Sequence, residues 1–149
     1  MRTSLVIVSG YLLLLFISLF VSTNMITFQR VMDAVLSTNA KEIALSKQYI
    51  TDLREKQFNS VTERLAPALK NYQSELALLK ISDLFPNEKP MSTTLVGFSK
   101  NITKNLTTIT SIFQYKYPHK WITAGVVLEK NGDSTNIKGV SIIDRKSVV

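Results

Sequence analysis

The longest uncharged stretch of the chain lies near its start, and it limits what the chain can fold into. No Asp, Glu, Lys or Arg occurs between Arg2 and Arg30, and residues 5–21 read LVIVSGYLLLLFISLFV. A helix that crosses the hydrocarbon core of a bilayer, about 30 Å thick, needs about 20 residues. The uncharged residues on either side complete this length. We therefore expect a transmembrane signal anchor over residues 4–25, preceded by a short cytoplasmic tail, residues 1–3.

A cleaved secretory signal is the alternative interpretation of this stretch. The apolar part of such signals spans about 7–15 residues and ends at small residues that form a cleavage site. The apolar run is longer here, and Val21-Ser22-Thr23 is a poor cleavage site. These two observations favour an uncleaved anchor.

The flanks of the anchor indicate its orientation. A very short tail that carries Arg2 is typical of a signal anchor, which leaves the C-terminal domain outside the cytoplasm. The absence of Cys from the chain agrees with an oxidising compartment such as the bacterial periplasm. We expect a protein that crosses the bacterial inner (plasma) membrane once, with the lipid bilayer as its first partner and a periplasmic or extracellular C-terminal domain.

Residues 26–82 are predicted to form a helical stalk. Apolar side chains recur mostly three, four or seven positions apart, which places them on one face of a helix. Pro67 removes a backbone donor, so we expect a long helix to about Ala66 and a shorter helix to about Lys80. The apolar face from 43 to 79 is longer than a small domain can cover, which predicts a homo-oligomer or an envelope partner protein. Its members are Ile43, Ile50, Leu53, Val61, Leu65, Leu69, Tyr72, Leu76 and Leu79.

The remainder of the chain is predicted to mix helix and strand. Prolines in DLFPNEKP indicate a linker over residues 83–91. Residues 92–149 should form a helix plus a two-stranded region. Apolar residues three and four apart favour the helix up to Gln114, although its β-branched residues favour a strand. Strands are expected over 121–129 and 137–144, joined by a wide turn at Asn131-Gly132. The fold class is thus α+β, with an N-terminal transmembrane helix, long amphipathic helices and a C-terminal β-hairpin or small sheet.

This order of elements resembles a known family. The likeness is carried by the helix expected before YKYPHKWITAGVVLEKNGD and by the second strand, GVSIIDRKSVV. In both segments a hydrophobic run ends in an acidic residue and a turn. Behind a membrane span and two helices, they resemble the N-terminal part of a Cache-type membrane-anchored bacterial sensor domain, over residues 22–149. A complete domain of this family has more strands than the two expected here, so its ligand pocket is not transferred to this chain.

Side chains that most enzymes need are scarce. The chain has no Cys and one His, His119, which stands between Pro118 and Lys120 and should lie in a surface loop. One His without Cys cannot form a structural zinc site, and the scattered glycines form no phosphate-binding loop. We expect no enzyme, no catalytic residue, no metal and no cofactor.

Positive charge is concentrated in one segment. The net charge is +7, and no acidic residue occurs between Lys89 and Leu128, where lysines alternate with aromatic residues. Such a segment either forms an ordinary solvated surface or contacts an anionic ligand or partner. An external domain would not meet nucleic acid, so none is expected. The candidate contact residues are Lys100, Lys104, Lys116, Lys120 and Trp121.

These patterns together predict a non-catalytic extracytoplasmic protein. It would act at the bacterial envelope by protein contact or by ligand sensing. The alternative is a structural component of a secretion or pilus assembly machine, which needs the same anchor and helical face but no pocket.

Overall fold

The computed structural model describes residue 27 and residues 29–146. The predicted cytoplasmic tail, 1–3, and the predicted anchor, 4–25, lie outside these residues. Within the described residues, no helix has the length and the apolar character that a membrane span requires. The chain divides into two compact units, Met1–Ala40 and Lys41–Val149. The described part of the first unit is helical over residues 29–38.

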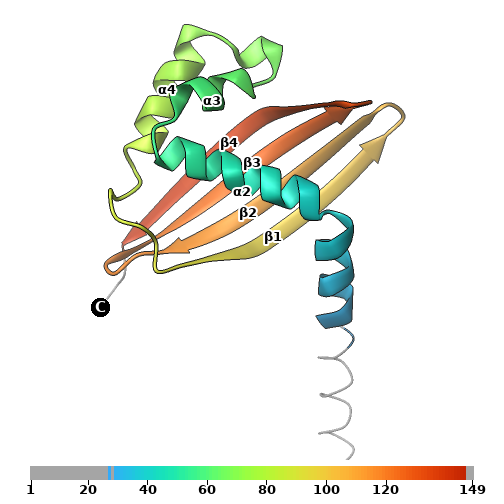
Figure 1. The fold of residues 1–149 in the computed structure, drawn as a ribbon, viewed down its shortest axis with the longest axis horizontal. Coiled ribbons are helices and arrows are strands. Elements are labelled where there is room, and N and C mark those ends of the chain that lie inside the picture. Colours follow the sequence, from blue (N-terminus) through green and yellow to red (C-terminus); the bar gives the residue numbers. More distant parts are fainter. Residues whose placement is uncertain (1–26, 28, 147–149) are drawn as a thin grey trace, which may run out of the picture. The chain divides into compact units, whose positions relative to one another are not determined.

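The second unit combines helices with one antiparallel sheet, so the predicted α+β class is confirmed. The four strands lie in the order β1-β2-β3-β4, each beside its neighbour in sequence (Figure 1). The elements are α2 (Ala40–Arg54), α3 (Phe58–Glu63), the 3-10 helix η1 (Pro67–Leu69), α4 (Tyr72–Ser82), β1 (Ser92–Thr103), β2 (Leu106–Lys116), β3 (Lys120–Asn131) and β4 (Ser134–Lys146).

The helix predicted up to Gln114 is wrong, because this region forms β1 and β2. The two strands pair from Ser92 with Lys116 to Thr103 with Leu106. Along β2, every second residue from Ile109 to Tyr115 is buried, and the residues between them are more exposed. The many β-branched residues of this segment fit a pleated surface better than a helix. Pairing of β2 with β3 then joins this pair to the β3–β4 pair in one sheet.

The two strands predicted near the C-terminus are confirmed, but the turn between them is tight rather than wide. Asn131 pairs with Ser134, which leaves only Gly132 and Asp133 in the loop. Gly132 has a φ of +58°, a conformation that costs glycine little because it has no Cβ. Asn131-Gly132 therefore correctly predicted the position of the turn, and both strands continue closer to this turn than expected.

The helices predicted over 26–82 are present, but they do not form a continuous stalk. α2 ends at Arg54, and Lys56 then takes a left-handed backbone with a φ of 59°. The N–H groups of Lys56 and Gln57 donate to the carbonyls of Leu53 and Asp52 at 3.2 and 2.8 Å. Such paired bonds around a left-handed residue close a helix end. The chain therefore turns back well before Pro67.

Pro67 does not end a long helix as predicted, because α3 already ends at Glu63, whereas the segment after α4 is free of helix as expected. Pro67 begins η1, a position at which its missing N–H costs nothing. The segment from 84 to 91 contains no helix and joins α4 to β1.

The core lies between the helices and one face of the sheet. α2 crosses this face (Figure 1), and its Tyr49, Ile50 and Leu53 are fully buried. Beneath them, Ile109 and Leu128 are equally buried side chains of the strands. Burial of one such side chain contributes about 1.5–3 kcal/mol. The side chains in the first half of the predicted 43–79 face are therefore buried in the core of the same molecule.

The segment between α3 and η1 is fixed to the edge of β4. Ile137 N–H donates to the Arg64 carbonyl, and Ala66 N–H donates to the Ile137 carbonyl, each at 2.8 Å. Leu65 and Ile137 form an isolated parallel bridge at this point. This attachment holds α3 beside β4, while the chain continues through η1 into α4.

Candidate functional site: a cleft between α3 and α4

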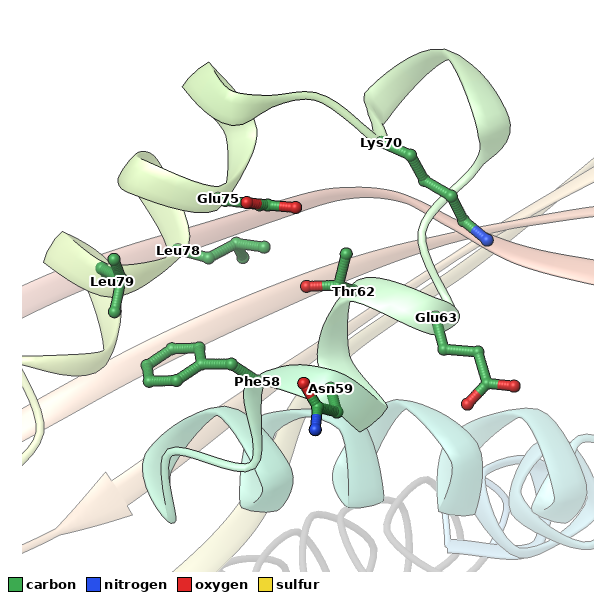
Figure 2. A pocket seen from close by; sticks show the side chains of 8 residues that line it. All are labelled: Phe58, Asn59, Thr62, Glu63, Lys70, Glu75, Leu78 and Leu79. Atoms are coloured by element: carbon green, nitrogen blue, oxygen red, sulfur yellow. The ribbon is translucent and has the colours of Figure 1, made fainter.

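A cleft of about 530 Å³ opens between α3, η1 and α4 (Figure 2). Clefts of about 300–1,000 Å³ are typical of binding sites in proteins. Residues from three consecutive segments contribute to its walls. They are Phe58, Asn59, Thr62, Glu63, Lys70, Glu75, Leu78 and Leu79.

Local sequence spacing determines which side chains face the cleft. In α3, Phe58 and Thr62 are four residues apart, and in α4 the same spacing separates Glu75 from Leu79. Residues at this spacing share one helix face. α4 begins where the Asn71 side chain accepts a hydrogen bond from the Ser74 N–H at 3.0 Å. This N-cap satisfies a free N–H group at the start of α4 and stabilises the helix that forms one wall of the cleft.

One end of the cleft is apolar. Figure 2 shows Phe58 and Leu79 together at this end, with Leu78 beside them. Leu78 is buried, whereas Leu79 is 42% exposed. Leu79 also belongs to a row of exposed apolar residues on α4, which we call the α4 stripe. Its members are Tyr72, Leu76 and Leu79.

The other end of the cleft is charged. Lys70 and Glu63 lie at this end in Figure 2, and Glu75 extends over the middle. Within residues 29–146, none of these three side chains forms an ion pair or a hydrogen bond. Two carboxylates and one ammonium give the cleft a formal charge of −1. Its charged groups are therefore available to a binding partner.

The chemistry of the cleft suits binding. Its polar groups are carboxylates, one ammonium, the Asn59 amide and the Thr62 hydroxyl. No cluster of three metal-ligating side chains occurs in the part of the chain that the structure describes. His119 is exposed in the turn between β2 and β3, as predicted for a surface residue. Apolar contact and charge complementarity are what the cleft offers.

The lysines predicted to contact an anionic partner do not gather in one patch. Lys100 lies in β1 and Lys104 in the β1–β2 turn, whereas Lys116 ends β2 at the opposite end of the strand. At about 3.3 Å per residue, the length of β2 separates these groups by roughly 30 Å.

The remaining candidates, Lys116, Lys120 and Trp121, meet at one end of the sheet. Lys116 pairs with Trp121 across the strands, and its Nζ lies 5.3 Å from the Trp121 ring centroid. Lys120 Nζ donates to the Leu84 carbonyl at 2.7 Å and to Asp144 at 3.1 Å. Lys120 is therefore engaged in holding the 84–91 segment to the sheet.

A second cluster, which the sequence did not reveal, surrounds Arg54 at the end of α2. Its guanidinium side chain is only 13% exposed and donates to Glu55 at 3.0 Å. A pocket of about 270 Å³ lies here, and Lys56, another of its lining residues, pairs with Asp83 at 2.9 Å. Because Arg54 and Lys56 already have carboxylate partners, this pocket has less unsatisfied charge than the α3–α4 cleft.

Three buried tyrosines have raised pKa values, and Arg54 of the second cluster acts on two of them. Burial raises the pKa of the Tyr49 and Tyr115 hydroxyls above their ordinary range, and Arg64 and Arg54, respectively, oppose the shift. Burial likewise raises the pKa of Tyr117, again against the effect of Arg54. The hydroxyls of Tyr49 and Tyr115 are buried without a hydrogen-bond partner. These groups are neutral in the folded protein at ordinary pH.

The sequence pattern contained part of the cleft. The apolar face from 43 to 79 includes the whole α4 stripe, and this is the portion that stays exposed. The charged residues Glu63, Lys70 and Glu75 carried no such signal, because polar residues at these positions look like an ordinary solvated surface. Comparisons of the chain with protein-family models, with curated proteins and with solved structures found no match.

Proposed function

We propose that the chain is a single-pass, membrane-anchored, non-catalytic protein that holds a segment of a partner protein against the α3–α4 cleft outside the cytoplasm. The supporting observation is the cleft itself, where exposed apolar side chains adjoin charged side chains that have no ion-pair partner among the described residues 29–146. The uncharged stretch over 4–25 provides the anchor and the location at the bacterial inner membrane.

Protein contact explains the exposed surface better than the sensing of a small ligand. A pocket for a small molecule buries about 70–90% of its ligand. The α4 stripe instead continues outside the cleft, and its Tyr72 is 72% exposed. Exposed apolar and aromatic side chains in a row are typical of surfaces that bind proteins.

The alternative function, a structural component of a secretion or pilus assembly machine, is favoured by the edge formed by β1. This strand has 12 residues, pairs only with β2 and carries one charged residue, Lys100. Val96 and Ile102 on this strand are 52% and 69% exposed. An edge strand of this kind can pair with a strand of another chain. Assembly of this type would use β1 instead of the cleft.

Cysteine labelling tests the proposed function, because the native chain has no Cys. Leu79→Cys reports on the cleft, Val96→Cys reports on β1, and Ile143→Cys is a control on β4 with comparable exposure. Each full-length variant is labelled with a membrane-impermeant maleimide, first in spheroplasts and then after purification.

We expect labelling at position 79 to be slower in spheroplasts than in the purified chain by at least about fivefold, since a partner removes this site from solvent. Position 143 should label equally fast in both preparations. Equal rates at 79 would reject the proposed function, and slow labelling at 96 alone would favour the assembly component. Failure of position 143 to label in spheroplasts would reject the extracytoplasmic location.

A further inference from the structure

The charge of the cleft is opposite to that of the whole protein. The chain carries a net charge of +7, but Glu63 and Glu75 outnumber Lys70 in the cleft. A local charge of opposite sign favours partners that the rest of the surface repels. The cleft is therefore the place where a cationic partner would be tolerated and retained.

The two carboxylates lie at different places along the cleft. Glu75 lies over the middle of the cleft near Leu78, and Glu63 lies across from Lys70 at the far end (Figure 2). Both carboxylates are exposed and have no partner within residues 29–146. A cation that binds here would form charge-assisted hydrogen bonds without displacing an existing ion pair.

The exposed apolar residues of the α4 stripe lie along one face of the helix. Tyr72, Leu76 and Leu79 follow at the four- and three-residue spacing of one helix face. Beside them, α3 and α4 form the two walls of the cleft. A groove between two helices accepts the apolar face of a third helix, which is a common mode of peptide recognition.

We propose that the α3–α4 cleft takes an amphipathic helix of a partner protein that carries Lys or Arg beside its apolar face. This inference rests on the proposed function and specifies the chemistry of the partner. The apolar face of the incoming helix lies on Phe58 and the α4 stripe, and its cations reach Glu75 and Glu63.

The same charges argue against the membrane surface as the occupant. Anionic headgroups attract basic surfaces and repel carboxylates. A lipid surface would therefore meet the Lys116 end of the sheet more favourably than the cleft. Lys70 allows a further test of the charge preference. Its ammonium repels a cationic partner, so its removal should strengthen the binding of such a partner.

The binding experiment uses the full chain in nanodiscs of uncharged phosphatidylcholine. Two designed fluorescent peptides share an apolar face of Leu and differ only in having Lys or Glu on the flanks of that face. Binding is measured by anisotropy, and the signal of empty nanodiscs is subtracted. We expect the Lys peptide to bind at least roughly tenfold more tightly than the Glu peptide, with a preference that falls as salt is added.

Charge variants locate the effect. Glu75→Lys should remove most of the preference for the Lys peptide, and Lys70→Glu should increase it. Glu88→Lys is the matched control, since it changes the net charge equally at an exposed residue of the 84–91 segment that does not line the cleft. Among residues 29–146 the side chains of Glu75 and Lys70 make no hydrogen bond or ion pair, so these substitutions should leave the fold intact.

Three outcomes would overturn the inference: equal binding of both peptides, binding of neither peptide, or equal weakening by Glu88→Lys and Glu75→Lys. Protection of Leu79→Cys in spheroplasts together with equal peptide binding would reject the partner's chemistry and leave the proposed function standing. Loss of that protection would reject the function itself.

Discussion

α2 and α4 have similar apolar spacing, but the fold uses them differently. α2 buries Tyr49, Ile50 and Leu53 completely against the sheet. α4 buries Leu78 and leaves Leu76 and Leu79 exposed by 38% and 42%. Periodicity identifies which face of a helix is apolar, but it does not identify what covers that face. The comparison separates the part of the molecule that provides stability from the part that is free to bind.

The largest expected effect is a difference in the cost of truncation. Leu53→Ala should lower the free energy of unfolding by about 2–4 kcal/mol, because it leaves a cavity in the core. Leu76→Ala should lower it by only about 1 kcal/mol, because this side chain is already 38% exposed and leaves no closed cavity. Denaturant unfolding can be followed by the fluorescence of Trp121, the one Trp of the chain. Equal losses for the two variants would show that the α4 stripe is also part of the core.

The second largest expected effect is a difference in the cost of adding side-chain volume. Ala124 is fully buried in β3, so Ala124→Leu should overpack the core and cost about 1–3 kcal/mol. Thr62→Leu places a similar apolar side chain in the open cleft, where it should change stability by less than about 0.5 kcal/mol. Thermal unfolding of both variants measures the contrast. A cost at Thr62 that matched the cost at Ala124 would mean that the cleft is closed in solution.

A pH experiment compares buried and exposed tyrosines. Because burial raises the pKa of Tyr115 in the folded state, folding favours the protonated hydroxyl. The stability that this protonated side chain contributes is fully present below the ordinary tyrosine pKa of about 10, and it is lost as pH rises above that value. The loss from this side chain should reach about 1 kcal/mol at pH 11.

Two conservative variants isolate this contribution. Tyr115→Phe should weaken the alkaline loss, and it should leave stability at pH 7 unchanged or slightly higher, since the buried hydroxyl has no partner. Tyr72→Phe should change neither the alkaline loss of stability nor the stability at pH 7, because Tyr72 is exposed. Unfolding curves at pH 7, 10 and 11 provide the measurement. An identical alkaline profile for Tyr115→Phe and the native chain would contradict the assigned cause.

Elements that depend on neighbouring residues were predictable from the sequence. Pro67 begins η1 because its fixed φ suits a first helical position and its missing donor is not needed there, and Gly132 permits a tight turn through its own backbone. The strands on either side of Gly132 were recognisable for the same reason, because β-branched residues favour extended backbone locally. These predictions needed no knowledge of distant parts of the chain.

Features that depend on distant residues were not predictable. Leu95, Phe98 and Ile102 have helical spacing, but β1 forms because its backbone pairs with β2, which in turn pairs with β3. The cleft depends on the chain reversing after Lys56 and again through η1, which brings Glu63 and Glu75 to one opening. Neither reversal is visible in the periodicity of the residues that it brings together.

The smallest expected effect lies where the two regions join. Lys56 adopts the left-handed backbone at the end of α2, and its side chain pairs with Asp83 at the end of α4. Left-handed backbone costs a residue with a Cβ about 1 kcal/mol more than glycine, whereas an exposed ion pair contributes between about 0 and 1 kcal/mol. Lys56→Gly should therefore raise stability slightly, by about 0.5 kcal/mol, and Lys56→Ala should lower it, because alanine keeps the Cβ and loses the pair. Denaturant midpoints of both variants and of the native chain decide the order, and a Gly variant less stable than the native chain would show that the ion pair outweighs the backbone strain.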